Sequence, residues 1–315
     1  MIRNLIAEKI GHKFRSSNKT RQASGLSPCM GMIASSVPNS AKVVVDNARH
    51  IELSVQRFRP KNLILATIFA TRRELEHLRK SFPNVNIYVM VHSNSPFLAV
   101  QHEAMQRINE AKESGAILAV NDERLVRAIP GAVWLPNIYN GNFAHPRAIQ
   151  SKEEIRVICS GSLRPMKNHL TQALAAIKYA DESGKRLRFF VNRRSEGGAP
   201  VLSNLKNLFL GIPHSLEFLE WKEHGQFVES LRHFDIGMQV SMSESFNIVA
   251  ADYAWAGLPM VVSHEVRWAS DSVKADCHDV DDIASKMRYC DKHTHESQAG
   301  LASFSKGAID IWSKI

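Results

Sequence analysis

The chain has 315 residues, of which 44% are hydrophobic and 23% charged, with a formal net charge of +9. This length and composition allow a large buried core and predict two domains of about 150 residues each. No apolar run approaches the ~18–20 residues of a membrane span, and the start lacks the apolar segment of a signal peptide, so we expect a cytoplasmic protein. The four cysteines show no CxxC spacing, which indicates neither a zinc site nor a disulfide framework.

The positive charge is concentrated in the first half of the chain. Residues 1–150 hold 20 Lys and Arg against 10 Asp and Glu, whereas residues 151–315 hold 20 against 21. This asymmetry predicts that the first half faces a polyanion or an anionic membrane surface, while the second half binds something small.

Short apolar, β-branched runs alternate with amphipathic stretches along the chain. The predicted strands are 42–45, 63–69, 85–91, 116–120, 132–135, 155–160, 187–191, 216–220, 236–240 and 260–262, and the predicted helices include 70–81, 97–113, 167–182 and 223–233. Continuous apolar runs are typical of parallel strands covered on both faces, so the order predicts two doubly wound α/β domains. The expected domains are 1–140 and 141–297, with a helix at about 298–315 packing back on the first and an Asn-, Gly- and Pro-rich boundary at 137–154.

Polar residues follow the predicted strands, at the sheet edge where open α/β folds bind ligands. In the first half they include Arg72, Arg73, His92 and Asn94, and in the second half Gly161, Arg164, Lys167 and Glu244. We therefore expect the binding groups at these positions.

The segment SESFNIVAADYAWAGLPMVVS (243–263) places two acids, Glu244 and Asp252, eight residues apart at the head of an apolar helix before Gly257 and Pro259. Solubility alone would scatter charges along a solvated face. The position of Glu244 at a strand-to-helix turn therefore indicates a chemical role.

Two segments together resemble the donor-binding half of the retaining GT-B glycosyltransferases with a glycogen-synthase-like or sucrose-synthase-like C-terminal domain. They are GSLRPMKNHLTQALAAI (161–177) and HFDIGMQVSMSESFNIVAADYAWAGLPMVVS (233–263). The resemblance covers roughly residues 150–290, and ESFNIVAAD is similar to viral members of the group. It implies two Rossmann-like domains facing each other across a cleft and transfer of a hexose, glucose, from a nucleotide diphosphate sugar such as UDP-glucose, with no metal and no cofactor. The positions that match the group's motifs are Gly161, Arg164, Lys167, Glu244, Asp252, Gly257 and Pro259.

The resemblance also implies roles for these residues. Arg164 and Lys167 would meet the charge of the leaving diphosphate, since fixed cations can stabilise it without a metal. Glu244 would accept hydrogen bonds from the donor sugar and Asp252 from the ribose. The turn residues Ser245, Phe246 and Asn247 would line the donor site, although Ser245 and Asn247 stand where members usually carry glycines.

Two further side chains are candidates by position. His92 closes a predicted strand where related enzymes place a histidine at the transferred sugar, and Trp221 ends another strand near the expected nucleobase. The Asp279-Val280-Asp281 triplet spells the DxD of metal-dependent glycosyltransferases, but no strand precedes it, so it predicts a helix N-cap instead.

The acceptor is expected on the basic first domain, contacted by Arg72, Arg73 and Asn94. The favoured acceptor is a hydroxymethylated base in DNA, because the phosphates of DNA would pair with these cations. The alternative is a lipid or cell-surface polysaccharide at an anionic membrane, with Ile2, Leu5, Ile6 and Ile10 on one face of an amphipathic start. A non-catalytic nucleic-acid-binding protein that keeps a vestigial fold is the alternative of another class.

Overall fold

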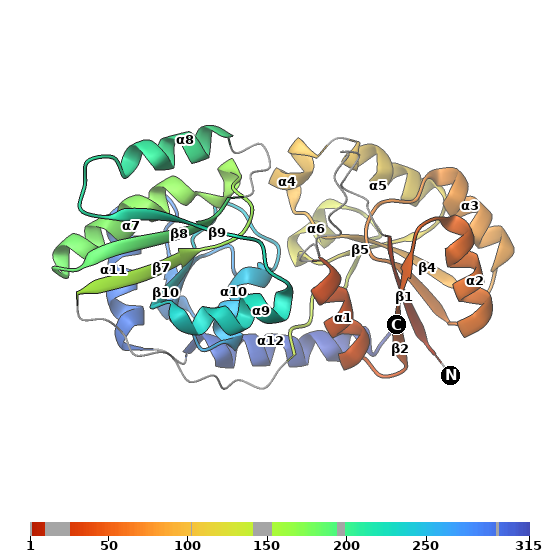
Figure 1. Cartoon of the computed structure of the whole chain (residues 1–315). Helices are drawn as coiled ribbons and strands as arrows, with labels where there is room; N and C mark the ends of the chain where they lie inside the picture. The colour runs from red at the N-terminus through yellow and green to blue at the C-terminus, as the bar shows by residue number, and fades with distance from the viewer. Residues whose placement is uncertain (1, 10–25, 102, 141–152, 194–198, 294–295) are drawn as a thin grey trace. The chain divides into compact units, whose positions relative to one another are not determined.

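The computed structural model describes residues 2–9, 26–101, 103–140, 153–193, 199–293 and 296–315 (Figure 1). Contacts between Cα atoms divide the chain into two compact units. Unit 1 is Met1–Asn140 with Phe304–Ile315, and unit 2 is Gly141–Ser303. Most of the predicted boundary segment, residues 141–152, lies outside the described residues.

Unit 1 is built on six parallel strands in the order β2-β1-β3-β4-β5-β6. The strands are β1 Asn4–Lys9, β2 Ser40–Val45, β3 Asn62–Leu65, β4 Asn86–Val91, β5 Ile117–Val120 and β6 Val133–Trp134. The helices are α1 Leu26–Ser36, α2 Ala48–Phe58, α3 Arg72–Ser81, α4 Ser95–Val100, α5 Ala104–Glu113 and α6 Glu123–Ala128. Five of these strands were predicted, although the predicted run 63–69 leaves the sheet after Leu65.

The expected amphipathic start of the chain is wrong for residues 4–9, which form β1. This strand pairs with β2 on one side and β3 on the other, and Leu5 and Ile6 are fully buried on opposite faces of the sheet. Their side chains are core and supply no membrane-inserting face, while Ile10 lies outside the described residues. At the amino ends of the strands, Asn62 donates to the Asn4 side chain at 2.8 Å, which adds a buried polar link between β1 and β3.

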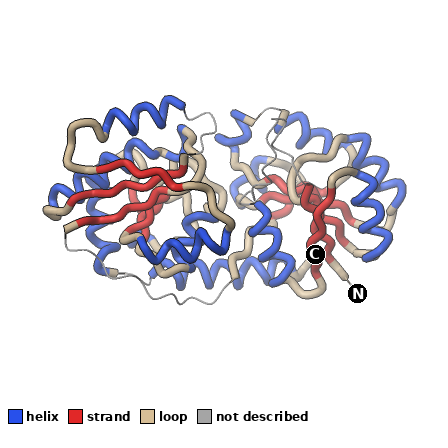
Figure 2. The backbone as a smooth tube through the Cα atoms, viewed as in Figure 1, coloured by secondary structure: helices blue, strands red, loops and turns tan. Residues whose placement is uncertain are grey.

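Unit 2 contains a second sheet of six parallel strands, in the order β12-β11-β10-β7-β8-β9. Its strands are β7 Glu154–Cys159, β8 Arg186–Asn192, β9 Ser215–Leu219, β10 Ile236–Gln239, β11 Met260–Ser263 and β12 Lys274–Ala275. Its helical segments are η1 Pro165–Lys167, α7 His169–Glu182, α8 Ala199–Leu208, α9 His224–Ser230, η2 Leu231–His233, α10 Ile248–Trp255, η3 Asp271–Val273 and α11 Val280–Lys292, and α12 Glu296–Trp312 runs from unit 2 into unit 1. Helices lie on both sides of each sheet (Figure 2). Both units are therefore doubly wound α/β folds, as predicted.

Helix α10 packs directly on strand β10. A Cβ atom added at Gly237 would lie 2.4 Å from the Tyr253 ring, so the absence of a side chain on β10 makes room for this tyrosine. The Tyr253 hydroxyl reaches the residue after β7, where it accepts from the Ser160 amide at 3.0 Å and bonds the Ser160 hydroxyl at 2.9 Å. Tyr253 is fully buried, so it fixes α10 against both central strands.

The Asp279 triplet is a helix cap, as predicted. The Asp279 carboxylate accepts from the amides of Asp281 and Asp282 at 2.8 and 3.0 Å, at the start of α11. No disulfide joins the four cysteines, and burial raises the pKa of the Cys159 thiol to about 12. In the described part of the chain no helix is long and apolar enough to cross a membrane.

We expect Gly237→Ala to destabilise unit 2 by about 1–3 kcal/mol, the range for overpacking a tight core. The added methyl group would collide with the Tyr253 ring, which cannot move without losing its bonds to Ser160. Urea unfolding followed by circular dichroism measures the change. Gly225→Ala on α9 is the matched control, because an added Cβ atom there meets nothing within 4 Å. Equal stability of the two variants would contradict the prediction.

Candidate functional site

The carboxyl ends of β7 and β10 form the switch point of unit 2, where the chain turns from building one half of the sheet to building the other. The first turn after β7 contains Gly161 at φ +117°, a conformation that side chains other than glycine rarely adopt. Its amide donates to the Asn192 side chain, at the end of β8, at 2.8 Å. The sequence therefore needs glycine here to turn the backbone across the sheet edge.

The loop after β7 is tied to the loop after β10 by buried amide side chains. Asn168 donates to the carbonyl oxygens of Val240 and Cys277, at 3.1 and 2.7 Å. Gln172 accepts from the Val240 amide at 2.8 Å. These bonds use backbone groups that the strands leave unpaired, so the two loops form one rigid wall.

Lys167 and Glu244 meet on this wall. The Lys167 Nζ atom lies 2.5 Å from Glu244 Oε1, and the two side chains are 15% and 7% exposed. Removing one partner of a largely buried pair leaves the other charge uncompensated, which costs far more than breaking a surface pair. Arg164 stands three residues before Lys167, at the start of the 3-10 turn η1, and is half-buried. The structure thus brings together the cation predicted for the diphosphate and the acid predicted for the sugar.

Asn247 adopts the backbone conformation that glycine would have supplied. Its φ is +61°, in the left-handed region that asparagine tolerates better than most residues. Its side chain also caps α10, accepting from the Ala250 amide at 2.9 Å, and donates to Gln239 at 3.0 Å. Asn247 therefore allows the same turn as glycine would and also caps α10.

The neighbours of Asn247 have different places in the turn. Phe246 is buried and its ring centroid lies 6.0 Å from that of Trp268, whose indole donates to the Phe246 carbonyl at 2.7 Å. Ser245 is half-buried beside it. Phe246 thus anchors the turn by packing.

Asp252 is bonded to a histidine that sequence reasoning did not find. His224 Nε2 lies 2.7 Å from Asp252 Oδ1, and this hydrogen bond raises the pKa of His224. His224 opens α9, three residues after the half-buried Trp221 that follows β9. Its place shortly after the predicted strand 216–220 is the signal in the sequence that could have found it.

His169 is a second histidine that the sequence did not mark. It begins α7 directly after the loop that carries Lys167 and is 2% exposed. Burial, with a smaller contribution from the charge of Lys167, lowers the pKa of His169 to about 3. The ring is therefore neutral at physiological pH.

In unit 1, His92 directly follows β4 as predicted and is held by its neighbours at the carboxyl edge. Its Nε2 atom lies 2.7 Å from the Ala66 carbonyl oxygen, so this nitrogen carries the proton and donates, while Asn121 Nδ2 lies 3.4 Å from Nδ1. Asn121, which follows β5, was not predicted. The predicted Asn94 is buried as the N-cap of α4.

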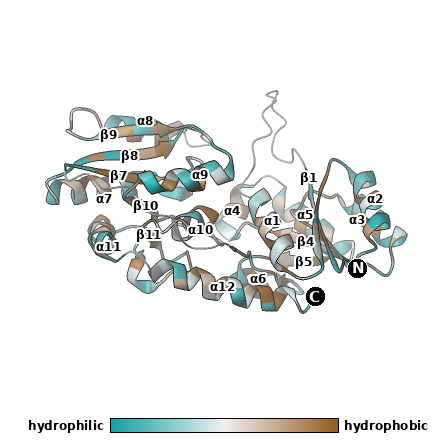
Figure 3. Cartoon of the chain, turned by 60° about the horizontal axis from the view of Figure 1, so that its bottom comes forward, coloured by the Kyte–Doolittle hydropathy of each residue, from teal (hydrophilic) through white to brown (hydrophobic). Residues whose placement is uncertain are grey.

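The two arginines predicted for the acceptor begin α3 and are both exposed. Arg72 is engaged by its own chain: its guanidinium lies 2.7 Å from Glu76 and 2.5 Å from Glu113. These contacts raise the pKa of Arg72 and partly neutralise its charge. Arg73 shares the exposed surface of α3, which Figure 3 shows as largely hydrophilic.

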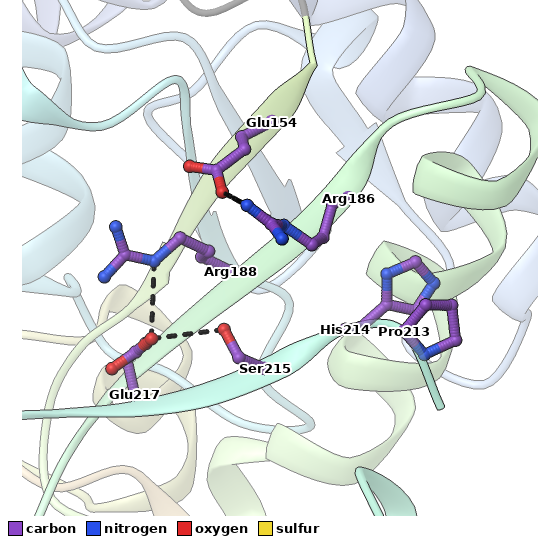
Figure 4. A pocket seen from close by; sticks show the side chains of 7 residues that line it. All are labelled: Glu154, Arg186, Arg188, Pro213, His214, Ser215 and Glu217. Carbon is purple, nitrogen blue, oxygen red and sulfur yellow. Dashed lines mark hydrogen bonds and ion pairs between the residues drawn. The ribbon is translucent and has the colours of Figure 1, made fainter. Parts of the chain in front are cut away.

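A pocket at the opposite, amino-terminal edge of the second sheet is polar but already paired (Figure 4). Arg186 bonds Glu154, and Arg188 lies 3.3 Å from Glu217. Because its charges satisfy each other and ligands of open α/β sheets bind at the carboxyl edge, we do not place the functional site here. Among the described residues no group of three or more His, Cys, Asp or Glu side chains is placed to hold a metal ion.

Comparison with known proteins links this geometry to enzymes of one fold. No protein-family model matches the sequence, and no curated protein matches it. Among solved structures, HepE of Anabaena in complex with UDP and glucose is similar at a TM-score of 0.65 and 11% identity, over 100% of this chain and 98% of that one. A trehalose-6-phosphate synthase of E. coli bound with UDP-2-fluoro glucose matches at a TM-score of 0.62 and 13% identity, over 99% of this chain and 97% of that one. Sucrose-phosphate synthase from Thermosynechococcus elongatus matches at a TM-score of 0.62 and 12% identity, over 99% of this chain and 100% of that one.

The chain has the GT-B fold. The likeness extends over the whole length of both chains, so both Rossmann-like units belong to it, including unit 1, whose sequence matched only in its strand pattern. At this identity the comparison establishes the fold alone. The assignments of all the predicted site residues to substrates, those of Lys167, Glu244 and Asp252 included, stay predictions.

Two histidines of unit 2, His169 and His224, predict opposite dependences of stability on pH. His169 has a folded pKa below its unfolded value of 6.5, so the unfolded chain takes up a proton that the folded chain does not, and stability falls as the pH drops below 6.5. His169→Leu should remove this loss, which amounts to about 2 kcal/mol at about pH 5 on the scale of ~1.4 kcal/mol per pKa unit.

His224 has a raised folded pKa, so its stabilising contribution is complete below about pH 6.5 and is lost as the pH rises through the folded value. Asp252→Asn should therefore cost more stability in mildly acidic than in mildly alkaline buffer, the reverse of the pattern for His169→Leu. Denaturant unfolding of both variants across this range measures the two profiles. Parallel pH profiles for the two variants would show that the assigned environments are wrong.

Proposed function

We propose that this protein is a nucleotide-sugar-dependent glycosyltransferase that moves a hexose, glucose, to a hydroxyl acceptor with retention of configuration and without a metal. The observation that carries the proposal is the largely buried pair of Lys167 and Glu244 on the switch-point wall of a GT-B fold. Support for retention comes from the resemblance of Glu244 and Asp252 to the paired acids of retaining enzymes. The neighbours solved with UDP and glucose or a UDP-sugar make UDP-glucose the donor to test first.

The chemistry asks for little more than positioned charges. The bond between the anomeric carbon and the diphosphate breaks, the acceptor oxygen forms the new bond on the same face, and the acceptor proton leaves with the nucleoside diphosphate. In this proposal Arg164 and Lys167 stabilise the charge that grows on the diphosphate. Glu244 accepts from sugar hydroxyls, and its contact with Lys167 holds the carboxylate in place before the donor arrives.

Replacing Lys167 or Arg164 with Ala should lower turnover by about 10²-fold or more, the range for losing one preorganised charge-stabilising group. The assay is release of UDP from UDP-glucose, by transfer or by slow hydrolysis, with and without a chelator. Lys178→Ala is the matched control, because Lys178 lies farther along α7 with its side chain 41% exposed and pairs with Glu182 and Asp281. Activity that is insensitive to both substitutions, or that a chelator abolishes, would contradict the proposal. Release from no member of a nucleotide-sugar panel would favour the non-catalytic alternative.

For the acceptor we propose a hydroxymethylated base in DNA. The support is the excess of positive charge in residues 1–150 and the exposed cations of α3, Arg73 and Lys80. Arg57, Arg59 and Lys61 are also exposed, but they precede β3 and lie on the far edge of the sheet. The membrane alternative relied on an apolar anchor at the chain start, and β1 buries the Leu5 and Ile6 side chains of that anchor. A buried target base would have to leave the stack to reach a transferred sugar.

Binding of hydroxymethylated duplex should weaken steeply with salt, with a slope of about −0.9 per phosphate contact in a log–log plot. The double variant Arg73→Ala/Lys80→Ala should reduce that slope by about 2 if both cations contact phosphates. Arg72→Ala is the comparison, since Glu76 and Glu113 already engage Arg72 and the loss should be smaller. Fluorescence anisotropy measures binding, and radiolabelled glucose measures transfer. Transfer to a polysaccharide or lipid acceptor but not to the duplex would overturn the DNA proposal.

A further inference from the structure

The pair formed by His224 and Asp252 has its two members at different depths. The Asp252 side chain is 4% exposed, whereas that of His224 is 29% exposed. The carboxylate therefore lies beneath the imidazole, and a ligand arriving from solvent meets the ring more readily than the acid. Among the described residues, the His224 ring makes one hydrogen bond, and its partner is Asp252.

The pair also lies at the ligand-binding edge of the sheet. Helix α9 begins with His224, shortly after the carboxyl end of β9 at Leu219. Asp252 lies in the second turn of α10, the helix that Asn247 caps directly after the Glu244 turn. The strand order separates β9 from β10 by β8 and β7. The hydrogen bond therefore ties the segment after β9 to the helix at the switch point.

His224 and Asp252 are the two side chains of this pair that could bind a ribose, and they differ in how far they extend toward a ligand. The resemblance assigns the ribose contact to a glutamate, and Asp252 is shorter by one methylene group. Asp252 is also buried and already accepts from His224. An imidazole whose Nε2 is held by a carboxylate presents its other nitrogen at a fixed angle, and that nitrogen can bond a hydroxyl group. The ring thus supplies the reach that the acid lacks.

We propose that His224, oriented by Asp252, binds a ribose hydroxyl of the nucleotide donor, so that His224 is a nucleotide-binding residue and Asp252 a positioning residue. The inference rests on the proposed function. It changes the assignment of the second acid, which acts through the histidine and does not itself contact the ribose.

The test compares the binding of UDP with that of 2′-deoxy-UDP and 3′-deoxy-UDP by titration calorimetry. The wild type should bind UDP more tightly than at least one deoxy analogue. His224→Ala should bind UDP about tenfold more weakly, the equivalent of about 1.4 kcal/mol. It should also no longer distinguish UDP from that analogue, because the lost bond is the one to the missing hydroxyl. His224→Gln, which keeps a polar side chain of similar reach, should recover part of the discrimination and serves if the alanine variant does not fold.

A rescue separates the proposed contact from a structural role. In the double variant His224→Ala/Asp252→Glu, the longer acid can enter the space that the ring leaves and should restore the preference for UDP. Asp181→Asn is the matched control. Asp181 lies 3.0 Å from His214 in a second histidine–carboxylate pair of unit 2, and the His214 ring also accepts from Leu187 near the amino end of β8. This control should bind all three nucleotides as the wild type does.

The failures are distinguishable. If the wild type binds UDP but His224→Ala binds UDP equally well, or weakens equally for UDP and its deoxy analogues, the role of His224 is overturned and the proposed function stands. If the wild type binds none of UDP, ADP and GDP, both proposals fall. If ADP or GDP binds in place of UDP, the same comparison with its deoxy forms tests the role of His224 in the same way.

Discussion

The docking of Tyr253 against Gly237 is the constraint on which the candidate site depends. Because β10 offers no side chain at this position, α10 approaches the sheet closely, and the tyrosine hydroxyl reaches Ser160 at the end of β7. One side chain thereby fixes the distance between the switch-point strands and the helix that carries Asp252. Burial raises the pKa of Tyr253, so its hydroxyl stays protonated: it accepts from the Ser160 amide after β7 and can donate to the Ile158 carbonyl oxygen in β7 at 3.4 Å.

The functional groups gain their precision from this frame. The Glu244 turn is held between β10 and the cap of α10, while Lys167 is held by the amide network of Asn168 and Gln172. A largely buried ion pair then forms between two loops that have little freedom to adjust. Such an arrangement suits a reaction in which charge must be stabilised at a fixed place, because the reorganisation cost is met during folding.

The sequence predicted the strands of both sheets well, and its largest error has a physical cause. Consecutive apolar residues such as Leu5-Ile6-Ala7 fit a strand buried on both faces, but the wider spacing of apolar residues at the chain start also fits one face of a helix. Only pairing with β2 and β3 decides between the two, and that information is not local. The same limit applies to His224, whose meaning depends on a partner 28 residues away in the chain. Asn247 was recognisable as a departure from glycine, but its positive φ was not visible in the sequence alone.

The route of the chain through the two units bears on how the protein is made. Unit 1 contains residues from both sides of unit 2 in the sequence, and the later ones are bound to the earlier ones: Trp312 donates to the Pro136 carbonyl at 2.7 Å, and the Ser305 hydroxyl accepts from the Tyr139 amide at 3.2 Å. Trp312 is fully buried in this union. On the ribosome, domains generally fold in the order of their synthesis. Unit 1 therefore lacks its last residues, Phe304–Ile315, until all of unit 2 has been translated. The half of the molecule that begins first is completed last.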